Sequence, residues 1–325
     1  MAGFVLRRVA QSVAVILVMS VLVFLAVYAI GNPVEALIDP RATQADIERA
    51  TRALGLDRPL WEQYLTFLGN IARGDAGISW VFNEPALKIM LQRLPATLEL
   101  VAAALLLSLA AGIPLGLYAG YRPDSRITRA IMAGSILGFS LPAFWFGLML
   151  ILIFGVELNW LPVLGRGETA ELFGIAFSFL TLDGLAHLLL PALTLALSRV
   201  AMIIRLVRAG VREAALQDYV RFARAKGLTE GRILRVHILK NALIPVITVV
   251  GADFAGLLAF AVVTETVFAW PGMGKLIIDS IQALDRPVVV AYLMITVLMF
   301  IVINLVVDLL YSQLDPRIRL QDVKA

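Results

Sequence analysis

Six apolar runs, each close to 20 residues long, restrict the possible folds of this chain more than any other feature of its sequence. A helix needs about 20 predominantly apolar residues to cross the hydrocarbon core of a bilayer. Helices also satisfy their own backbone polar groups there. The sequence therefore predicts an all-α polytopic membrane protein with six spans, at residues 9–30, 97–119, 131–156, 187–207, 243–267 and 288–311.

The composition agrees with several membrane spans. Of the 325 residues, 60% are apolar and 16% are charged, whereas soluble domains are nearer half apolar and a quarter charged. The absence of cysteine excludes disulfides, thiol catalysis and cysteine-based zinc sites. The two histidines, His187 and His237, lie far apart in the sequence, so no metal site is expected.

Links rich in basic residues alternate along the chain with links that contain few of them. Arg7 and Arg8 precede the first span, and the links after spans two and four are rich in lysine and arginine. The link after span three carries only Arg166, and the link after span five only Lys275 and Arg286. Since basic links stay in the cytoplasm, both termini are predicted to be cytoplasmic.

The long link after span one is expected outside and folded. Thr43 with Asp46 resembles a capping box, and Gly55 is suited to end the helix that it starts. Pro59 is suited to open a second amphipathic helix. The resulting small helical domain either shields the span ends or docks another protein. The possible end points of the second helix are Gly69 and Gly74.

The stretch DYVRFARAKGL, residues 218–228, is a short basic helix between apolar spans. Tyr219, Phe222 and Ala223 are predicted to share one helical face, with Arg221 and Arg224 on another. Such a short helix is not stable alone, so the spans or a partner must hold it. Its basic residues fit contact with lipid headgroups.

A turn is predicted directly after this helix. Gly227 suits the left-handed position that ends a helix, and Thr229 can cap the next one beside Glu230. Ala223, Ala225 and Gly227 leave a notch of small residues. This notch favours the close approach of another protein surface over lipid contact alone.

Residues 218–251, DYVRFARAKGLTEGRILRVHILKNALIPVITVVG, resemble the cytoplasmic coupling segment of ATP-binding-cassette (ABC) importer permeases, in their dipeptide/oligopeptide (peptide/nickel) branch. Ala223 and Gly227 fit the general importer pattern, but Arg221 and Phe222 replace its first two residues, and Pro245 lies farther along. These departures are typical of the peptide branch. The resemblance also covers LRRVAQSV, LGLDRPLWEQYLTFLGNIARGDAGIS, PATLEL, ETVFAWPGMGKLIIDSIQALDRPVV and NLVVDLLYSQLDPRIR.

The resemblance implies a type I ABC importer permease fold of the first-permease kind. Residues 1–30 would form the cytoplasmic end and first span, residues 31–95 an external helical domain, and residues 96–325 the core with coupling segment 212–242. The residues expected to contact the ATPase subunit are Asp218, Tyr219, Arg221, Ala223, Arg224, Ala225, Lys226, Gly227 and Leu228.

The resemblance also implies the assembly and its place. The expected partners are a second homologous permease, two ABC ATPase subunits, an extracytoplasmic substrate-binding protein and the lipid bilayer of the bacterial inner membrane. The chain itself would bind no cofactor, because ATP and Mg²⁺ belong to the ATPase subunits. No nucleic acid partner and no catalytic residue are expected.

The stretch PGMGKL, residues 271–276, is not a P-loop. A P-loop requires a first glycine and a final hydroxyl, but Ala269 and Leu276 stand at those places. Trp270 and Pro271 are instead expected to form an interfacial turn with the indole at headgroup level. The resemblance implies that this turn, with Glu265 and Gly272, helps to close the outer gate.

Two further features lie inside the predicted spans. Asp253 is expected to line the translocation path and meet a substrate ammonium, or else to be a structural carboxylate that is hydrogen-bonded to a neighbouring helix or protonated. Glu99 and Asp308 are expected to reach the membrane interfaces. Glycines at every fourth position of span two predict close helix packing; they are Gly112, Gly116 and Gly120.

The leading function is therefore that of the permease subunit of an ATP-driven importer working by alternating access. The alternative is an ATP-independent secondary transporter or channel, although no internal repeat is evident. An intramembrane enzyme lacks the HExxH and G-x-S-x-G motifs. The sequence leaves the substrate open among dipeptides, oligopeptides, glutathione, nickel chelates and sugars.

Overall fold

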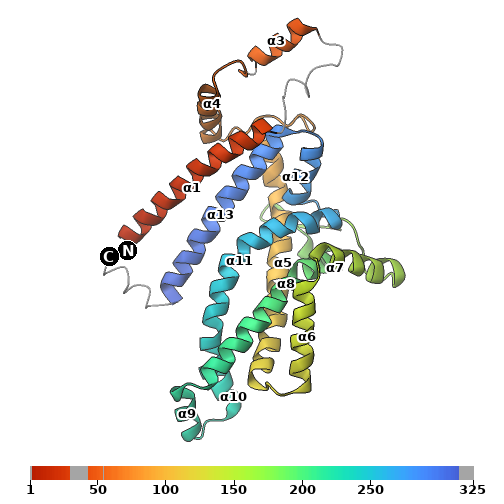
Figure 1. The fold of residues 1–325 in the computed structure, drawn as a ribbon. Helices are drawn as coiled ribbons and strands as arrows, with labels where there is room; N and C mark the ends of the chain where they lie inside the picture. The colour runs from red at the N-terminus through yellow and green to blue at the C-terminus, as the bar shows by residue number, and fades with distance from the viewer. Residues whose placement is uncertain (1, 30–42, 54, 315–325) are drawn as a thin grey trace. The chain divides into compact units, whose positions relative to one another are not determined.

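The computed structural model describes residues 2–29, 43–53 and 55–314, which are almost entirely helical (Figure 1). The chain divides into two compact units. The first comprises Met1–Leu94 and Leu276–Leu305, and the second comprises Pro95–Lys275 and Val306–Ala325. We describe each unit by itself.

The first unit contains α1 (Ala2–Ala29), α3 (Gln44–Ala53), α4 (Leu60–Ala72) and the larger part of α12 (Met273–Gln282) and of α13 (Arg286–Leu314). Helices α1 and α4 meet through an aromatic cluster. The ring of Phe24 lies 5.5 Å from that of Tyr64 and 5.7 Å from that of Phe67, and the Ser20 hydroxyl lies 2.8 Å from the Tyr64 hydroxyl. These contacts hold α4 against α1.

The two helices expected in the link after α1 are present. Thr43 donates from its backbone N–H and its hydroxyl to the Asp46 carboxylate, at 3.0 Å and 2.6 Å, and these bonds lower the pKa of Asp46. Gly55 takes a left-handed φ of 68° directly after α3. Pro59 precedes α4, which continues past Gly69 and ends at Ala72, close to Gly74 with its φ of 75°.

Asp285 ties the segment before α5 to the start of α13. Its buried carboxylate accepts hydrogen bonds from the Ser79 hydroxyl (2.5 Å) and the Trp80 backbone N–H (3.2 Å). Since buried carboxylates are costly without donors, this residue holds the segment before α5 against the start of α13.

The second unit is built on two long helices. They are α5 (Ala86–Tyr121) and α8 (Leu182–Ala215). The predicted glycine packing in α5 is confirmed, because a Cβ at Gly112, Gly116 or Gly120 would lie within 2.7 Å of a side chain of α8. The α8 side chains that fill these positions are Ile203, Val207 and Val211.

The third predicted span is not one helix. Helix α6 (Arg126–Ser140) ends before Leu141 and Pro142, and α7 (Ala143–Leu150) with η1 (Ile151–Glu157) continues at a bend of 106°. Figure 1 shows the two directions plainly. Proline is compatible with the first turn of a helix but disfavours a helical residue before it, so a helix ends here.

Four helices among the described residues are long and apolar enough to cross a membrane, or five if the bent pair is one span. The predicted spans 97–119, 187–207, 243–267 and 288–311 lie within α5, α8, α11 (Leu239–Val267) and α13. Residue 30 of the first predicted span lies outside the described residues, while residues 9–29 are helical.

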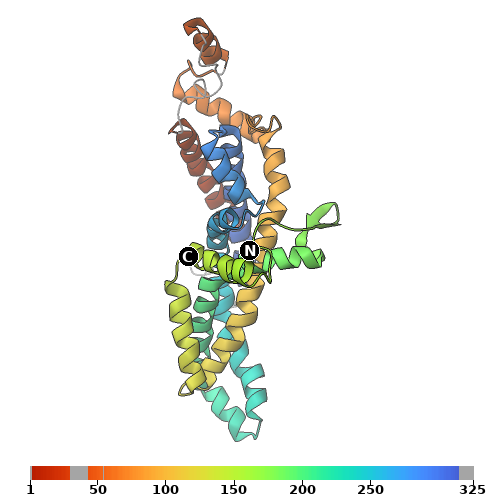
Figure 2. The same ribbon diagram turned by 90° about the vertical axis from the view of Figure 1, so that its right-hand side faces the viewer.

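The all-α prediction missed a β-hairpin in the link before α8. Strands β1 (Ala170–Leu172) and β2 (Ile175–Phe177) pair antiparallel, with Leu172 opposite Ile175. Phe173 and Gly174 form the two-residue turn with φ of 54° and 77°, as a hairpin turn of type I′ requires. The hairpin projects from the helices of its unit (Figure 2). A short 3₁₀ helix, η2 (Ser178–Leu180), leads into α8.

The segment between α8 and α11 contains three short helical pieces. They are α9 (Asp218–Ala225), α10 (Glu230–Arg232) and the π-helical η3 (Ile233–Ile238).

Candidate functional site

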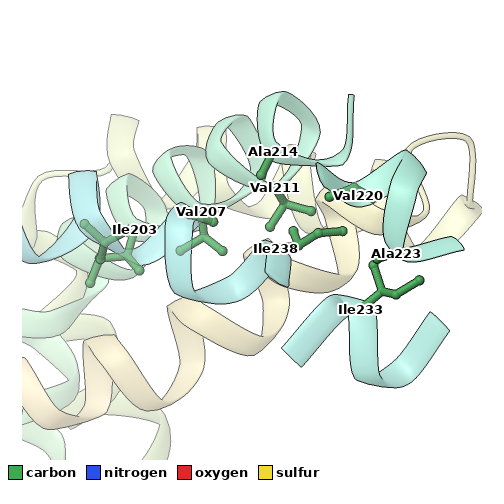
Figure 3. Packing of buried hydrophobic residues seen from close by; sticks show 10 residues of the cluster. Ile203, Val207, Val211, Ala214, Val220, Ala223, Ile233 and Ile238 are labelled. Carbon is green, nitrogen blue, oxygen red and sulfur yellow. The ribbon is translucent and has the colours of Figure 1, made fainter. Parts of the chain in front are cut away.

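Helix α9 is held by the chain's own core. Val220 is completely buried and Ala223 is 4% exposed, and both belong to an apolar cluster with residues of α8 and η3 (Figure 3). The cluster supplies the support that a helix of two turns needs. Its labelled members in α8 and η3 are Ile203, Val207, Val211, Ala214, Ile233 and Ile238.

The face assignment made from sequence was partly wrong. Tyr219 and Phe222 do not share the buried face with Ala223; they are 40% and 61% exposed. Leu216, just before α9, is 71% exposed. These three apolar side chains form an exposed surface next to a helix that is fixed from behind. The burial of Ala223 also means that its small side chain serves packing within the chain.

Polar contacts hold the exposed surface in place. The Asn241 side-chain amide of α11 donates to the Tyr219 hydroxyl at 2.8 Å. The Lys226 ammonium lies 4.6 Å from the centre of the Phe222 ring. Asp218 and Arg221 form an exposed ion pair at 3.6 Å, which contributes little to stability.

The turn after α9 follows the Schellman pattern that the sequence indicated. Gly227 has a φ of 75° and donates its N–H to the Arg224 carbonyl, and the Leu228 N–H reaches the Ala223 carbonyl at 3.3 Å. Glu230 then accepts a hydrogen bond from Arg224 Nε at 2.9 Å. Thr229 takes the N-cap position of α10, but its side chain makes no cap bond. Ala225 and Lys226 are exposed.

The predicted gate residues meet around one buried carboxylate. Glu265, at the end of α11, accepts hydrogen bonds from the Thr97 hydroxyl (2.6 Å) and the Lys275 backbone N–H (3.0 Å). A Cβ at Gly272 or Gly274 would overlap with this carboxylate. The glycines of PGMGKL are therefore needed to surround Glu265, which explains the motif without a nucleotide.

Trp270 does not face lipid headgroups, contrary to the sequence expectation. Its indole is fully buried, and its N–H donates to the Ala96 carbonyl at 2.9 Å. The Met273 N–H donates to the Thr97 hydroxyl at 2.8 Å. Pro271 lies in the turn between Trp270 and Gly272 and is half-buried. Hydrogen bonds thus join Ala96 and Thr97 of α5 to the turn after α11.

Glu99 does not reach an interface either. Its carboxylate is buried and accepts hydrogen bonds from Arg166 Nη2 (2.6 Å) and from the Ser178 and Phe179 backbone N–H groups (2.7 and 2.8 Å). Arg166 stands out as the single basic residue of its link, and this was the signal in the sequence for a buried partner. The pair anchors the hairpin link to α5. The side chain of Asp308 lies outside the described part of the chain.

Asp253 also has a partner that sequence reasoning missed. Arg199 of α8 lies with its Nε 2.6 Å from Asp253 Oδ2. The carboxylate is therefore paired with a basic residue of a neighbouring helix.

Comparison with known proteins places these features in a family. Residues 112–320 match the family described as binding-protein-dependent transport system inner membrane component, and residues 1–101 match the corresponding N-terminal family. The chain is 40% identical to the di/tripeptide transport system permease protein DppB of Pseudomonas aeruginosa, over 99% of this chain and 100% of that protein. It is 39% identical to the oligopeptide transport system permease protein AppB of Bacillus subtilis, over 98% and 99%.

A solved structure shows the same fold. The chain resembles the MetNI methionine ABC transporter in an inward-facing conformation with a TM-score of 0.55 and 16% identity, covering 70% of this chain and 96% of that one. The full-length sequence matches and this fold agree with a helical membrane permease. The chain belongs to the binding-protein-dependent transport system inner membrane components, the non-catalytic permease subunits of ABC importers.

Proposed function

We propose that this permease imports di- and oligopeptides or similar small solutes. Two relatives that match over the whole chain are named as di/tripeptide and oligopeptide permeases. A third, at 36% identity, is named as a glutathione permease, and glutathione is itself a small peptide. The chemistry shared by these substrates is a short backbone with a carboxylate and an ammonium.

The chain has six spans in this proposal, with α1 as the first and residues 31–95 as an external domain. Both termini lie in the cytoplasm of a bacterial cell, and the chain is embedded in the inner membrane. Links rich in lysine and arginine alternate with links that have few of them, and this pattern supports the orientation. Helix α1 has 28 residues, and about 20 apolar residues are sufficient to span.

The complete importer contains a second homologous permease, two ABC ATPase subunits and an extracytoplasmic binding protein. ATP and Mg²⁺ act in the ATPase subunits. The exposed surface of Leu216, Tyr219 and Phe222 docks on an ATPase subunit, together with the charged residues of segment 212–242. Because α9 is packed on α8 and η3, a displacement of α9 is passed to the spans.

The outer part of the path is closed by the turn around Glu265 in this proposal. Trp270, Pro271 and Gly272 form that turn, and Asp253 lies deeper along the path. Alternating access then requires that α9 and the Glu265 turn have different contacts in the two states, since a partner shifts an equilibrium only through differential contacts.

The observation that carries the proposal is the exposed aromatic surface on α9, a helix packed against the chain's own core. Central interface residues, often aromatic, cost about 2 kcal/mol or more when truncated, which is roughly 30-fold in affinity. Phe222→Ala is therefore expected to weaken binding of the ATPase subunits by about that factor. Titration of purified ATPase subunits onto the permease pair in detergent measures it.

Phe173→Ala is the matched control, because Phe173 is 96% exposed and the proposed topology puts it on the side away from the ATPase subunits. It should leave ATPase binding unchanged. A chain that purifies without ATPase subunits and moves solute into liposomes without ATP would make the secondary-transporter alternative the better one.

A further inference from the structure

An ion pair joins the middle of α8 to α11 inside the predicted spans. Arg199 Nε lies 2.6 Å from Asp253 Oδ2, and the two side chains keep 14% and 26% of their surface exposed. Charges at such depth are costly and face a bundle interior or a water-filled cavity. This pair is neutral as a whole, yet it remains accessible.

The pair lies on an accessible stripe of α11. Asp253, Gly256 and Phe260 follow each other at helical spacing, and Phe260 is 57% exposed. The neighbouring Leu257 and Ala261 are buried. The Arg199 guanidinium carbon lies 5.6 Å from the centre of the Phe260 ring, so the ring borders the pair.

Gly256 leaves room beside both charges. A Cβ at this position would lie 3.0 Å from Asp253 Oδ1 and 3.2 Å from Arg199 Nη2. Any side chain at position 256 would therefore crowd Asp253 Oδ1 and Arg199 Nη2, the two polar atoms outside the closest contact of the ion pair. The glycine keeps one side of both charged groups open.

Building on the proposed import of peptides, we propose that Arg199 and Asp253 form a binding site for zwitterionic solutes in the translocation path. The guanidinium binds the solute carboxylate, the Asp253 carboxylate binds its ammonium, and Phe260 contacts the apolar part. The two protein charges pair with each other when the solute leaves. Solute binding then replaces the Arg199–Asp253 ion pair by two ion pairs between protein and solute. Because the protein pair re-forms on release, the solute is held weakly enough to leave the path.

The test is the charge preference of uptake by the complete importer, with its ATPase subunits, partner permease and binding protein in liposomes. The probes are alanyl-glutamyl-alanine and alanyl-lysyl-alanine. Asp253→Asn leaves Arg199 unpaired, so the uptake ratio of the glutamyl to the lysyl peptide should rise about fivefold or more. Arg199→Gln leaves Asp253 unpaired, so the same ratio should fall by a similar factor.

Asp124→Asn and Arg129→Gln are matched controls, because both residues are exposed and lie in or next to the link between α5 and α6. They should leave the ratio unchanged. The binding protein is the same throughout, so its own preference cancels when each variant is divided by wild type.

Two results would overturn the site. One is an unchanged ratio in both single variants. The other is an equal loss of uptake for both peptides that the charge swap R199D/D253R restores, since this would show a structural pair only. If the wild-type complex imports peptides and either result is found, the proposed site is refuted but the proposed function is not. If the wild-type complex imports no peptide, the proposed function is refuted as well.

Discussion

At the residue scale, two buried carboxylates of the second unit each have a specific set of donors. The Glu99 carboxylate accepts hydrogen bonds from Arg166 and from two backbone N–H groups. The Glu265 carboxylate accepts them from the Thr97 hydroxyl and from the backbone at the start of α12. A buried charge without such partners is strongly unfavourable. Both carboxylates therefore fix the links that surround them.

Arg166→Ala should destabilise the permease strongly, because it leaves the Glu99 carboxylate buried and unpaired. Breaking a buried pair in this way costs about 3–5 kcal/mol. Unfolding of the detergent-purified chain by heat or denaturant measures the loss. The double variant E99L/R166M removes both charges and should lose clearly less; an Arg166→Ala chain as stable as wild type would contradict the assigned pair.

At the element scale, small residues decide how closely helices approach. Gly116 lies against α8, where a Cβ would sit 2.7 Å from the Val207 Cβ and 2.8 Å from the Ile204 carbonyl oxygen. The second of these atoms is backbone and cannot move without moving α8. The spacing of the glycines thus sets the distance between α5 and α8.

Gly116→Ala is expected to cost about 1–3 kcal/mol, as overpacking of a filled core does. Gly134→Ala in α6 is the control, since nothing lies within 4 Å of a Cβ there and alanine favours helix over glycine. The melting temperatures of the two purified variants are compared. Equal melting temperatures would refute the close contact.

Helix α9 offers a second test at this scale, because Ala223 is buried and Ala225 is exposed on the same helix. Ala223→Leu should separate α9 from α8 and η3, and a helix this short then unfolds locally. Hydrogen exchange of the α9 amides should accelerate about 5- to 150-fold for an overpacking cost of about 1–3 kcal/mol. Ala225→Leu should leave their protection near wild type, and equal effects of both variants would refute the buried face.

At the scale of the whole molecule, the natural chain contains no cysteine, so single cysteines can report its orientation without background. Phe173→Cys is expected to react with a membrane-impermeant thiol reagent in intact cells. Ala225→Cys should react only after the cells are opened, because the proposed topology puts the basic links in the cytoplasm. The reverse pattern would invert the proposed topology.

Local signals in the sequence were sufficient for several features. Hydropathy located the helices that contain the spans, because burial in lipid depends on the composition of each segment alone. Gly227 indicated the end of α9, since few other residues adopt a positive φ at no cost. The Phe-Gly pair at residues 173–174 is a weak local signal for the hairpin turn, because the turn needs a positive φ at both residues and only the glycine favours it.

By itself, then, the sequence determined the helical membrane class, the orientation signals and the family, all of which depend on patterns within short segments. Only the tertiary structure decided which face of α9 is buried and which charges pair. Thr97 with Glu265 and Arg199 with Asp253 are far apart along the chain. Such pairs form because helix packing brings their side chains within hydrogen-bonding distance, and no local pattern specifies that packing.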